Sequence, residues 1–454
     1  MAIQKAKGQT RTERLLSALC DQTFLKLWSY ANPFNEDGKE LCDLIAIFEN
    51  HLFIFFDREC SVFDDASKDV LLTWERWRKR VIDKQIITAR GAEKYIRSGK
   101  PVFLDAKKTI QLPLEIPFDK VSIHKIIVAH GAANACKGFS EENMSGSLMV
   151  SYGEPGDDLP FPFAVHLDKA DPVHVFDSYN LSIVLKELDT FYDFVSYISV
   201  KEKAINELDG LSFCGEEELL AYYFMHFDED ENMHFIKDKN ETCNFMSIDQ
   251  GFWVKLGEHD QYKRKKIEDQ VSYLWDDFIQ RTCQNAFDGT LICDRDFFKG
   301  PSAIYEMAKE PRFVRRALSK HIIQVIKSFP DNAAPITRHI SFMPSFYKDK
   351  GYMFLQFYKD KITNYAEYRL VRQKMLEIAC GATKNKFPHL NKVVGIAIDA
   401  PKYQEDNSED FLLLNCEEWT DEDRRCYEEA NKLMGFYKSP SLKMTAIKTN
   451  EFPN

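Results

Sequence analysis

Residues 41–59 read LCDLIAIFENHLFIFFDRE, two almost continuously apolar runs separated by a short polar turn. The runs Leu41–Phe48 and Leu52–Phe56 predict two paired strands. Because neither run alternates with polar residues, we expect the hairpin to be buried on both faces. Apolar residues at helical spacing between Thr12 and Trp28 predict a helix just before it.

Acidic residues mark the open end of this hairpin. Asp43 heads the first strand, and Asp57 and Glu59 end the second. Because a tight turn pairs the strands, Asp43 and Asp57 are expected to lie close together, and Glu13 on the preceding helix can face the same end. Converging carboxylates form an oxygen-rich site of the kind that Mg²⁺ or Mn²⁺ prefers, and such an ion can activate water for attack on a phosphodiester. The sequence therefore predicts a metal site made by Glu13, Asp43 and Asp57.

The arrangement of a helix, an acidic residue opening a strand, a hairpin and a closing charged cluster resembles the PD-(D/E)XK restriction-endonuclease-like superfamily, and most of all its NERD-type branch. Gly38, Glu40 and Asp43 approximate the Gly-Glu-x-Asp-like approach to the first strand. The resemblance covers roughly residues 1–130 and implies an endonuclease-like αββαβ core.

The second motif of that family reads acid, any residue, lysine, whereas the corresponding positions here are Phe56, Asp57 and Arg58. Arginine does not deprotonate near neutral pH, so Arg58 cannot replace a proton-shuttling lysine. Two interpretations stay open. A bulge turns Asp57 inward and Lys79 or Lys84 supplies the ammonium group, or the site is inactive and Asp57–Arg58 is a surface ion pair. The resemblance implies catalytic roles for Glu40, Asp43, Asp57, Glu59 and Lys84.

A predicted helix over Lys68–Ile96 combines tryptophans with cations. Trp74 and Trp77 fall on its apolar side and are expected in the core. The other side is a candidate surface for nucleic-acid phosphates because of its charge and its position next to the predicted site. Its cationic residues are Arg76, Arg78, Lys79 and Arg80.

The whole chain is predicted to be mixed α/β with three parts. Residues 1–135 form the endonuclease-like domain, with a strand at Ser122–His130, and a Gly- and Ser-rich stretch follows. Residues 136–330 are a mostly helical middle region with some short strands, and residues 331–454 form a C-terminal α/β domain. In the last domain, Thr420 is expected to cap a helix.

Two further groups of polar residues admit two interpretations each. The first group flanks short strands and contains Asp168, Asp171, His174 and Asp177. These residues are either metal ligands or turn formers. The second group is acidic and consists of Asp399, Glu409 and Asp410. These residues either act as paired catalytic carboxylates or form ion pairs with a nearby cationic helix that contains Arg369 and Arg372.

The composition restricts the class of function. A net charge of -11 argues against sequence-independent coating of nucleic acid, but not against a nuclease, which needs only a positive groove. The 11 cysteines include no CxxC pair, and the longest apolar runs are too short for a bilayer, so we expect a soluble cytoplasmic protein with reduced thiols and no membrane contact. The absence of Walker A, GxGxxG, HExxH and GxSxG motifs removes the usual signals of kinases, dinucleotide enzymes and zinc proteases.

The function predicted from these patterns is a metal-dependent nuclease of a bacterial-type defence or DNA-processing system, with nucleic acid as its partner. The alternative is a catalytically inactive nuclease-like module that binds nucleic acid or protein. A protein partner and a homo-oligomer both stay open.

Overall fold

The structure is a computed structural model that describes residues 5–64, 69–139, 145–154, 161–228, 233–238, 242–288, 299–403, 408–438 and 450–452. The predicted mixed α/β class is confirmed. The chain forms two compact units, Gln4–Tyr262 and Lys263–Asn454, and the boundary between them lies inside helix α9 (Asp260–Asp269). None of the described helices is both long enough and apolar enough to cross a lipid bilayer.

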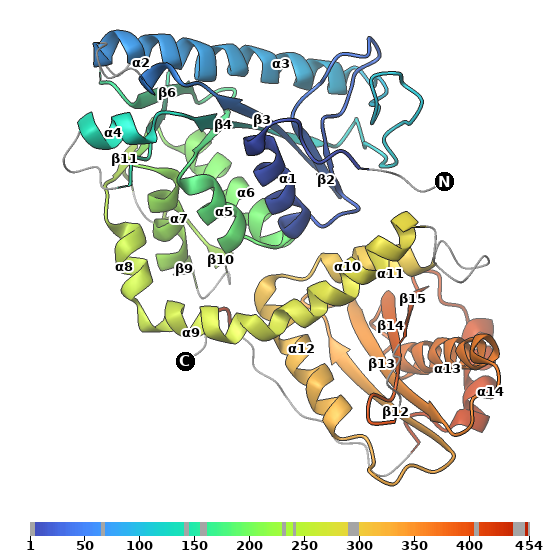
Figure 1. Cartoon of the computed structure of the whole chain (residues 1–454). Helices are drawn as coiled ribbons and strands as arrows, with labels where there is room; N and C mark the ends of the chain where they lie inside the picture. The colour runs from blue at the N-terminus through green and yellow to red at the C-terminus, as the bar shows by residue number, and fades with distance from the viewer. Residues whose placement is uncertain are drawn as a thin grey trace. The chain divides into compact units, whose positions relative to one another are not determined.

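A five-stranded sheet forms the centre of the first unit, in the order β1-β2-β3-β4-β7 (Figure 1). Strands β1 to β3 are antiparallel, whereas β3, β4 and β7 are parallel to one another. The predicted hairpin is present, and all of β2 and most of β3 are buried, as expected. The elements are α1 (Arg11–Thr23), β1 (Ser29–Ala31), β2 (Leu44–Phe48), β3 (His51–Glu59), the 3-10 helix η1 (Val62–Asp64), α2 (Val70–Arg78), the π-helix η2 (Lys79–Asp83), α3 (Lys84–Arg97), β4 (Ser122–His130) and β7 (His174–Asp177).

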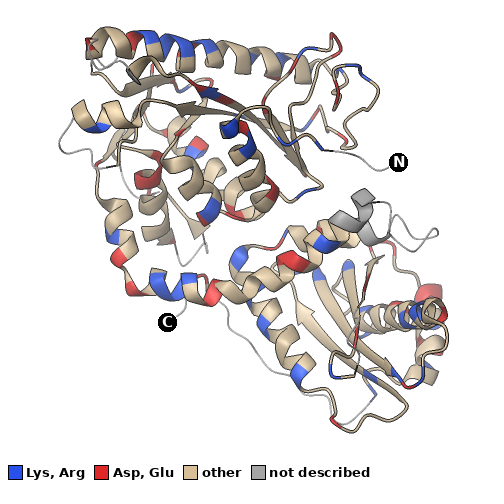
Figure 2. Ribbon diagram, viewed as in Figure 1, with Lys and Arg blue, Asp and Glu red and all other residues tan. Residues whose placement is uncertain are grey.

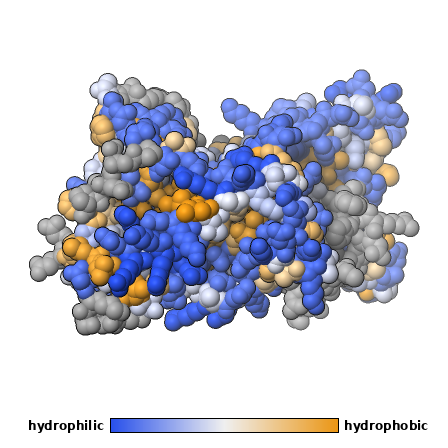
Figure 3. All heavy atoms as spheres, turned by 90° about the horizontal axis from the view of Figure 1, so that it is seen from above, coloured by the Kyte–Doolittle hydropathy of each residue, from blue (hydrophilic) through white to orange (hydrophobic). Residues whose placement is uncertain are grey.

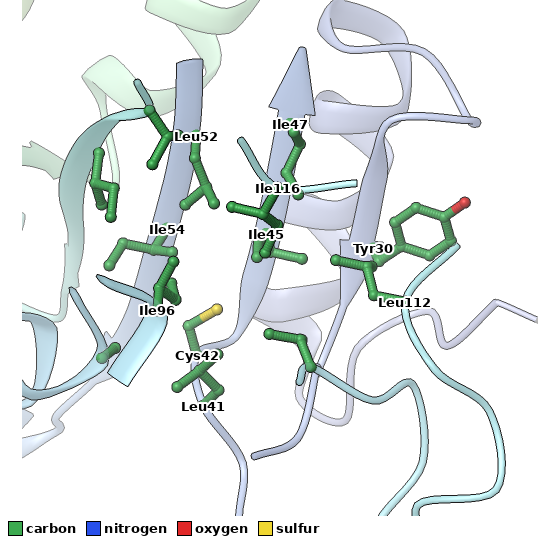
Figure 4. Close-up of a cluster of buried hydrophobic side chains, with 14 of the residues drawn as sticks. Tyr30, Leu41, Cys42, Ile45, Ile47, Leu52, Ile54, Ile96, Leu112 and Ile116 are labelled. Atoms are coloured by element: carbon green, nitrogen blue, oxygen red, sulfur yellow. The ribbon is translucent and has the colours of Figure 1, made fainter. Parts of the chain in front are cut away.

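The two faces of this sheet are covered by different helices, because successive side chains of a strand point to opposite faces. Leu52 and Ile54 of β3 pack with Ile96 of α3 in one apolar cluster, shown in Figure 4. The intervening Phe53 points the other way, where its ring packs against Phe24, just after α1, and Phe194 of α6 (Phe191–Glu207). Helix α3 therefore covers one face, and α1 and α6 cover the other.

A second sheet, in the order β11-β8-β5-β6, lies in the middle region together with helices. The expected domain boundary near residue 135 is not a unit boundary, because β7 comes later in the chain and pairs with β4. The elements are α4 (Ala133–Phe139), β5 (Met149–Gly153), β6 (Ala164–Asp168), α5 (Asn180–Glu187), α6, β8 (Gly210–Phe213), α7 (Glu216–Met225), β9 (Phe227–Asp228), β10 (Met233–His234), β11 (Phe245–Ile248) and α8 (Phe252–Glu258).

The second unit is an α/β unit with a four-stranded sheet, β12-β13-β14-β15, in which only β13 and β14 are parallel. It contains the predicted C-terminal α/β region but begins earlier, at Lys263 rather than at residue 331. Thr420 caps the last helix through a capping box, as predicted. The elements are α9, η3 (Gln270–Ser272), α10 (Tyr273–Asp288), α11 (Lys299–Ala308), α12 (Arg312–Lys327), β12 (Ile336–Pro344), β13 (Lys350–Lys359), α13 (Tyr365–Lys386), β14 (Lys392–Asp399), β15 (Glu409–Asn415) and α14 (Asp421–Met434).

Candidate active site at the carboxyl ends of the parallel strands

Three polar residues meet at one edge of the five-stranded sheet. Because β3 and β4 are parallel and β2 runs against them, the start of β2 lies at the same edge as the ends of β3 and β4. This edge carries Asp43 just before β2, Asp57 in β3 and His130 at the end of β4. The Asp57 backbone N–H donates a hydrogen bond of 2.7 Å to Asp43 Oδ2, so the structure brings the two aspartates together.

Two glutamates join the same edge through Asn32. The Asn32 side-chain amide donates to Glu13 Oε2 at 3.2 Å and to Glu40 Oε1 at 2.5 Å. Asn32 has a φ of +50°, in the left-handed region that asparagine tolerates better than most residues. Its amide oxygen is buried and has no hydrogen-bond partner in the described part of the chain. The edge therefore combines four acidic side chains with one unpartnered amide oxygen.

The electrostatics of Asp43 reflect this crowding. Its pKa is raised from 3.8 to about 7, mainly by burial and further by the nearby charges of Glu40, Glu13 and Asp57. The hydrogen bond from the Asp57 N–H opposes the rise but does not cancel it. A carboxyl held near neutrality by burial and like charges is stabilised when a proton or a cation is bound beside it.

The Asp57 carboxylate has two side-chain partners. Thr12 donates its hydroxyl to Asp57 Oδ1 at 2.6 Å, and His130 Nε2 lies 3.1 Å from Asp57 Oδ2. Asp57 is 9% exposed. The interpretation of Asp57–Arg58 as a surface ion pair is therefore wrong, because the Asp57 carboxylate is buried and is bound by α1 and β4.

The other nitrogen of His130 completes an Asp–His–Ser chain. His130 Nδ1 lies 2.8 Å from the hydroxyl of Ser178, an exposed residue just after β7. The geometry resembles that of a serine hydrolase triad. However, the backbone N–H groups of Tyr179 and Asn180 both donate to Asp177 Oδ1, so they are not available to stabilise an oxyanion beside Ser178.

The other residues predicted for catalysis lie elsewhere. Glu59 is exposed at the end of β3, and Lys84 is exposed at the start of α3. Helix α3 packs on the face opposite the Asp57 carboxylate, which accepts from Thr12 of α1. No lysine is among the described hydrogen-bond or ion-pair partners of Asp43 and Asp57. The ammonium group expected from Lys84 or Lys79 is thus not part of this cluster.

The cationic residues predicted on the outer side of the helix after the hairpin are solvent-accessible in the structure. Arg76, Lys79 and Arg80 are exposed, and Arg78 is partly exposed and pairs with Asp83 at 3.8 Å. Figure 2 shows several Lys and Arg residues along α2 and α3. Figure 3, a view from above, shows a mostly hydrophilic face with a compact hydrophobic patch near its centre.

The Asp168, Asp171, His174 and Asp177 group is not one site. Arg90 pairs with both Asp168 and Asp171, and Lys125 also pairs with Asp171. His174 instead joins His124 and Glu202 at the opposite edge of the sheet. In the part of the chain that the structure describes, these three residues form the only group of at least three His, Cys, Asp or Glu whose ligand atoms all lie within 4.8 Å of one another.

The second acidic group, in the C-terminal unit, is held by arginines. Arg372 pairs with both Asp399 and Asp410, and Arg369 pairs with Asp410. Of the two interpretations, the structure shows the ion pairs with the cationic helix, and they engage both aspartates. Glu409 pairs with Arg281 instead.

Sequence reasoning missed Asn32, His130 and Glu202. Asn32 lies between the predicted helix and the predicted hairpin, and His130 is simply the last residue of the predicted strand Ser122–His130. The signal for His130 is its place at the end of a strand parallel to β3, but finding it requires the sheet order, which the sequence does not state.

Comparison of the chain with protein-family models, with curated proteins and with solved structures finds no match to any of them.

Proposed function

We propose that the N-terminal unit is a divalent-metal-dependent phosphodiesterase that acts on nucleic acid, as the PD-(D/E)XK-like pattern implies. The observation that carries the proposal is the gathering of four acidic side chains at one end of the sheet, where the Asp57 N–H binds Asp43 and the Asn32 amide binds Glu13 and Glu40. No lysine or arginine is among the described partners of Asp43 or Asp57. A bound cation would reduce the repulsion between these carboxylates.

The donor set fits Mg²⁺ or Mn²⁺. Both ions favour oxygen ligands, and Glu13, Asp43 and Asp57 offer carboxylate oxygens at one edge of the sheet. The buried amide oxygen of Asn32 is a further oxygen without a partner there. When bound, the ion would supply Lewis-acid activation of water and of the phosphate.

His130 is the chain's own candidate for proton handling beside these carboxylates. Its Nε2 contacts Asp57, which fixes the ring, and its Nδ1 contacts the exposed Ser178 hydroxyl. An imidazole can hold or release a proton near neutral pH, which the arginine following Asp57 cannot do. This supports a site in which His130, on β4, takes the role that the family gives to a lysine on the second strand of the hairpin.

The cationic surface of α2 and η2 would attract the substrate. The Trp77 indole N–H donates to the backbone oxygen of His130 at 3.1 Å, which ties α2 to the same sheet edge as the carboxylates. Arg76 and Arg80 are exposed on these two helices, and their charge would attract the phosphates of a nucleic acid.

One observation favours the alternative, an inactive nuclease-like binding module. The ligand atoms of Glu13, Asp43 and Asp57 do not form a group within 4.8 Å of one another, and Asp57 already accepts from Thr12 and His130. In that case the cationic helix would still bind nucleic acid, but no bond would be cut.

The two functions are separated by cleavage assays on plasmid DNA and RNA with Mg²⁺ or Mn²⁺. The wild-type protein is compared with Asp43→Ala and with Asp119→Ala, which removes an exposed aspartate elsewhere in the same unit. Metal-dependent cleavage that Asp43→Ala abolishes and Asp119→Ala retains supports the phosphodiesterase. Equal background from all three proteins refutes it, and nucleic-acid binding that Arg76→Ala and Arg80→Ala weaken would then support the binding module.

A further inference from the structure

We propose that His124, His174 and Glu202 bind a divalent transition-metal ion of the zinc class, at a site separate from the carboxylate cluster. His124 lies in β4 and His174 begins β7, and these strands are parallel neighbours in which Ile126 pairs with His174. His124, Ile126 and His174 therefore point to the same face of the sheet. Helix α6 covers this face and provides Glu202.

Three ligand atoms converge at this point. His124 Nδ1 lies 2.8 Å from Glu202 Oε1, and His174 Nε2 lies 3.1 Å from the same oxygen. All three atoms lie within 4.8 Å of one another. Two imidazole nitrogens therefore converge on one carboxylate oxygen, and an ion bound by all three atoms at about 2.0–2.1 Å would take the place of these hydrogen bonds once the side chains move slightly apart.

The surroundings hold the histidine rings in place. His124 is 3% exposed, and its ring stacks on Phe53 with the centroids 4.6 Å apart. Its other nitrogen, Nε2, lies 3.0 Å from His51 Nδ1, and a partner on the second ring nitrogen is what orients a metal-bound histidine. His174 is fully buried, its Nε2 contacts Glu202, and its Nδ1 has no hydrogen-bond partner among the described residues.

The ligand chemistry selects the class of metal. Two imidazoles and one carboxylate suit Zn²⁺, Fe²⁺ or Co²⁺, whereas Mg²⁺ and Ca²⁺ favour all-oxygen sites. The Glu202 side chain is 27% exposed, so the site reaches solvent on one side. Three protein ligands with a solvent-facing side correspond to an open metal site, in which water or a substrate fills the remaining position.

This site does not depend on the proposed phosphodiesterase. His124 and His130 lie six residues apart on one strand, which separates the two sites by about 20 Å. The ligands differ as well, since the carboxylate cluster offers only oxygen atoms and this site offers two nitrogens and one oxygen. Binding at one site can therefore be measured while the other is disabled.

The test is titration of the full-length, metal-free protein with Co²⁺, followed by its visible absorption, and with Zn²⁺, followed by thermal unfolding. We expect one equivalent of Co²⁺ to give the strong absorption of a low-coordinate, nitrogen-ligated ion, and Zn²⁺ to displace it. Zn²⁺ in about tenfold excess should also raise the melting temperature, because an ion that binds only the folded state stabilises it. Glu202→Gln should weaken Co²⁺ binding by at least about tenfold.

Two further variants keep the result interpretable. His166→Asn removes a histidine of β6 that contacts the Glu154 backbone, and it should leave Co²⁺ binding unchanged. Asp43→Asn should also leave the strong absorption unchanged, even if it abolishes Mg²⁺-dependent cleavage. If the wild-type protein shows neither the absorption nor a Zn²⁺-dependent rise in melting temperature, the three residues are only a hydrogen-bonded group and the proposal is overturned. Binding that Glu202→Gln retains while folded would overturn it equally.

Discussion

Within the proposed active site, it is Asp43 whose pKa is raised by burial and by neighbouring negative charges. In the unfolded chain its pKa is near 3.8, and in the folded protein it is about 7. Below pH 4 both states hold the proton, so Asp43 does not affect stability. Between pH 4 and 7 only the folded state keeps it, so the contribution of Asp43 to the free energy of unfolding falls as the pH rises. Above pH 7 the full cost of the buried charge remains.

Replacing Asp43 with asparagine should therefore stabilise the protein in a pH-dependent way. We expect Asp43→Asn to raise the free energy of unfolding by on the order of 3 kcal/mol at pH 8 and to have little effect at pH 4. Urea unfolding at both values measures the difference, with Asp119→Asn as the control for an exposed aspartate. The same stabilisation at both pH values would mean that Asp43 is not the titrating group. Mg²⁺ bound at the cluster should reduce the advantage of the variant at pH 8.

Gly215 provides a second test at the residue scale. It has a φ of +122°, and a Cβ placed there would lie 2.6 Å from the Glu217 carboxylate, which folds back over it at the start of α7. We expect Gly215→Ala to destabilise the protein by about 2–4 kcal/mol, because it combines a strained backbone with a collision against a buried group. The matched control is Gly257→Ala in α8, where nothing lies within 4 Å of the added Cβ. Chemical unfolding of both variants tests this, and equal stabilities would contradict it.

Among the elements, α13 shows how a helix is fixed to a sheet by charge. Arg372 of this helix is fully buried and pairs with Asp399 of β14 and Asp410 of β15. We expect Arg372→Met to cost about 3–5 kcal/mol, because it leaves two buried carboxylates with fewer partners. Lys374→Met, on the exposed side of the same helix, should change stability by less than about 0.5 kcal/mol. A small effect of Arg372→Met in urea unfolding would show that tyrosines or water can replace the guanidinium.

The elements also show what the sequence can and cannot predict. The bounds of β4 and the cap at Thr420 follow from local signals, and both are found. The approach of Asp43 and Asp57 was predictable because a hairpin register is local. Asn32 and His130 were not, because their positions depend on strand order and on pairings between segments far apart in the chain. For the same reason the sequence could not show that Lys84 lies outside the cluster. The face of the sheet that α3 covers is set by tertiary packing.

At the scale of the whole molecule, each sheet lies entirely within one unit. The five-stranded sheet and its cluster around Ile45 and Ile54 belong to Gln4–Tyr262, and β12 to β15 with their own apolar cluster belong to Lys263–Asn454. A unit with its own core can unfold as a cooperative whole. Each unit is therefore expected to have its own transition.

Calorimetry of the full-length protein should then show two unfolding transitions, and single substitutions should assign them. Arg372→Met should lower the melting temperature of one transition only, because its partners all lie in the second unit. Asp43→Asn at pH 8 should raise the other transition only, because Glu13, Glu40 and Asp57 all lie in the first. A single transition that both variants shift would mean that the units fold cooperatively. If there are two, a Zn²⁺-dependent shift should appear only in the transition that Asp43→Asn moves, since His124, His174 and Glu202 belong to that unit.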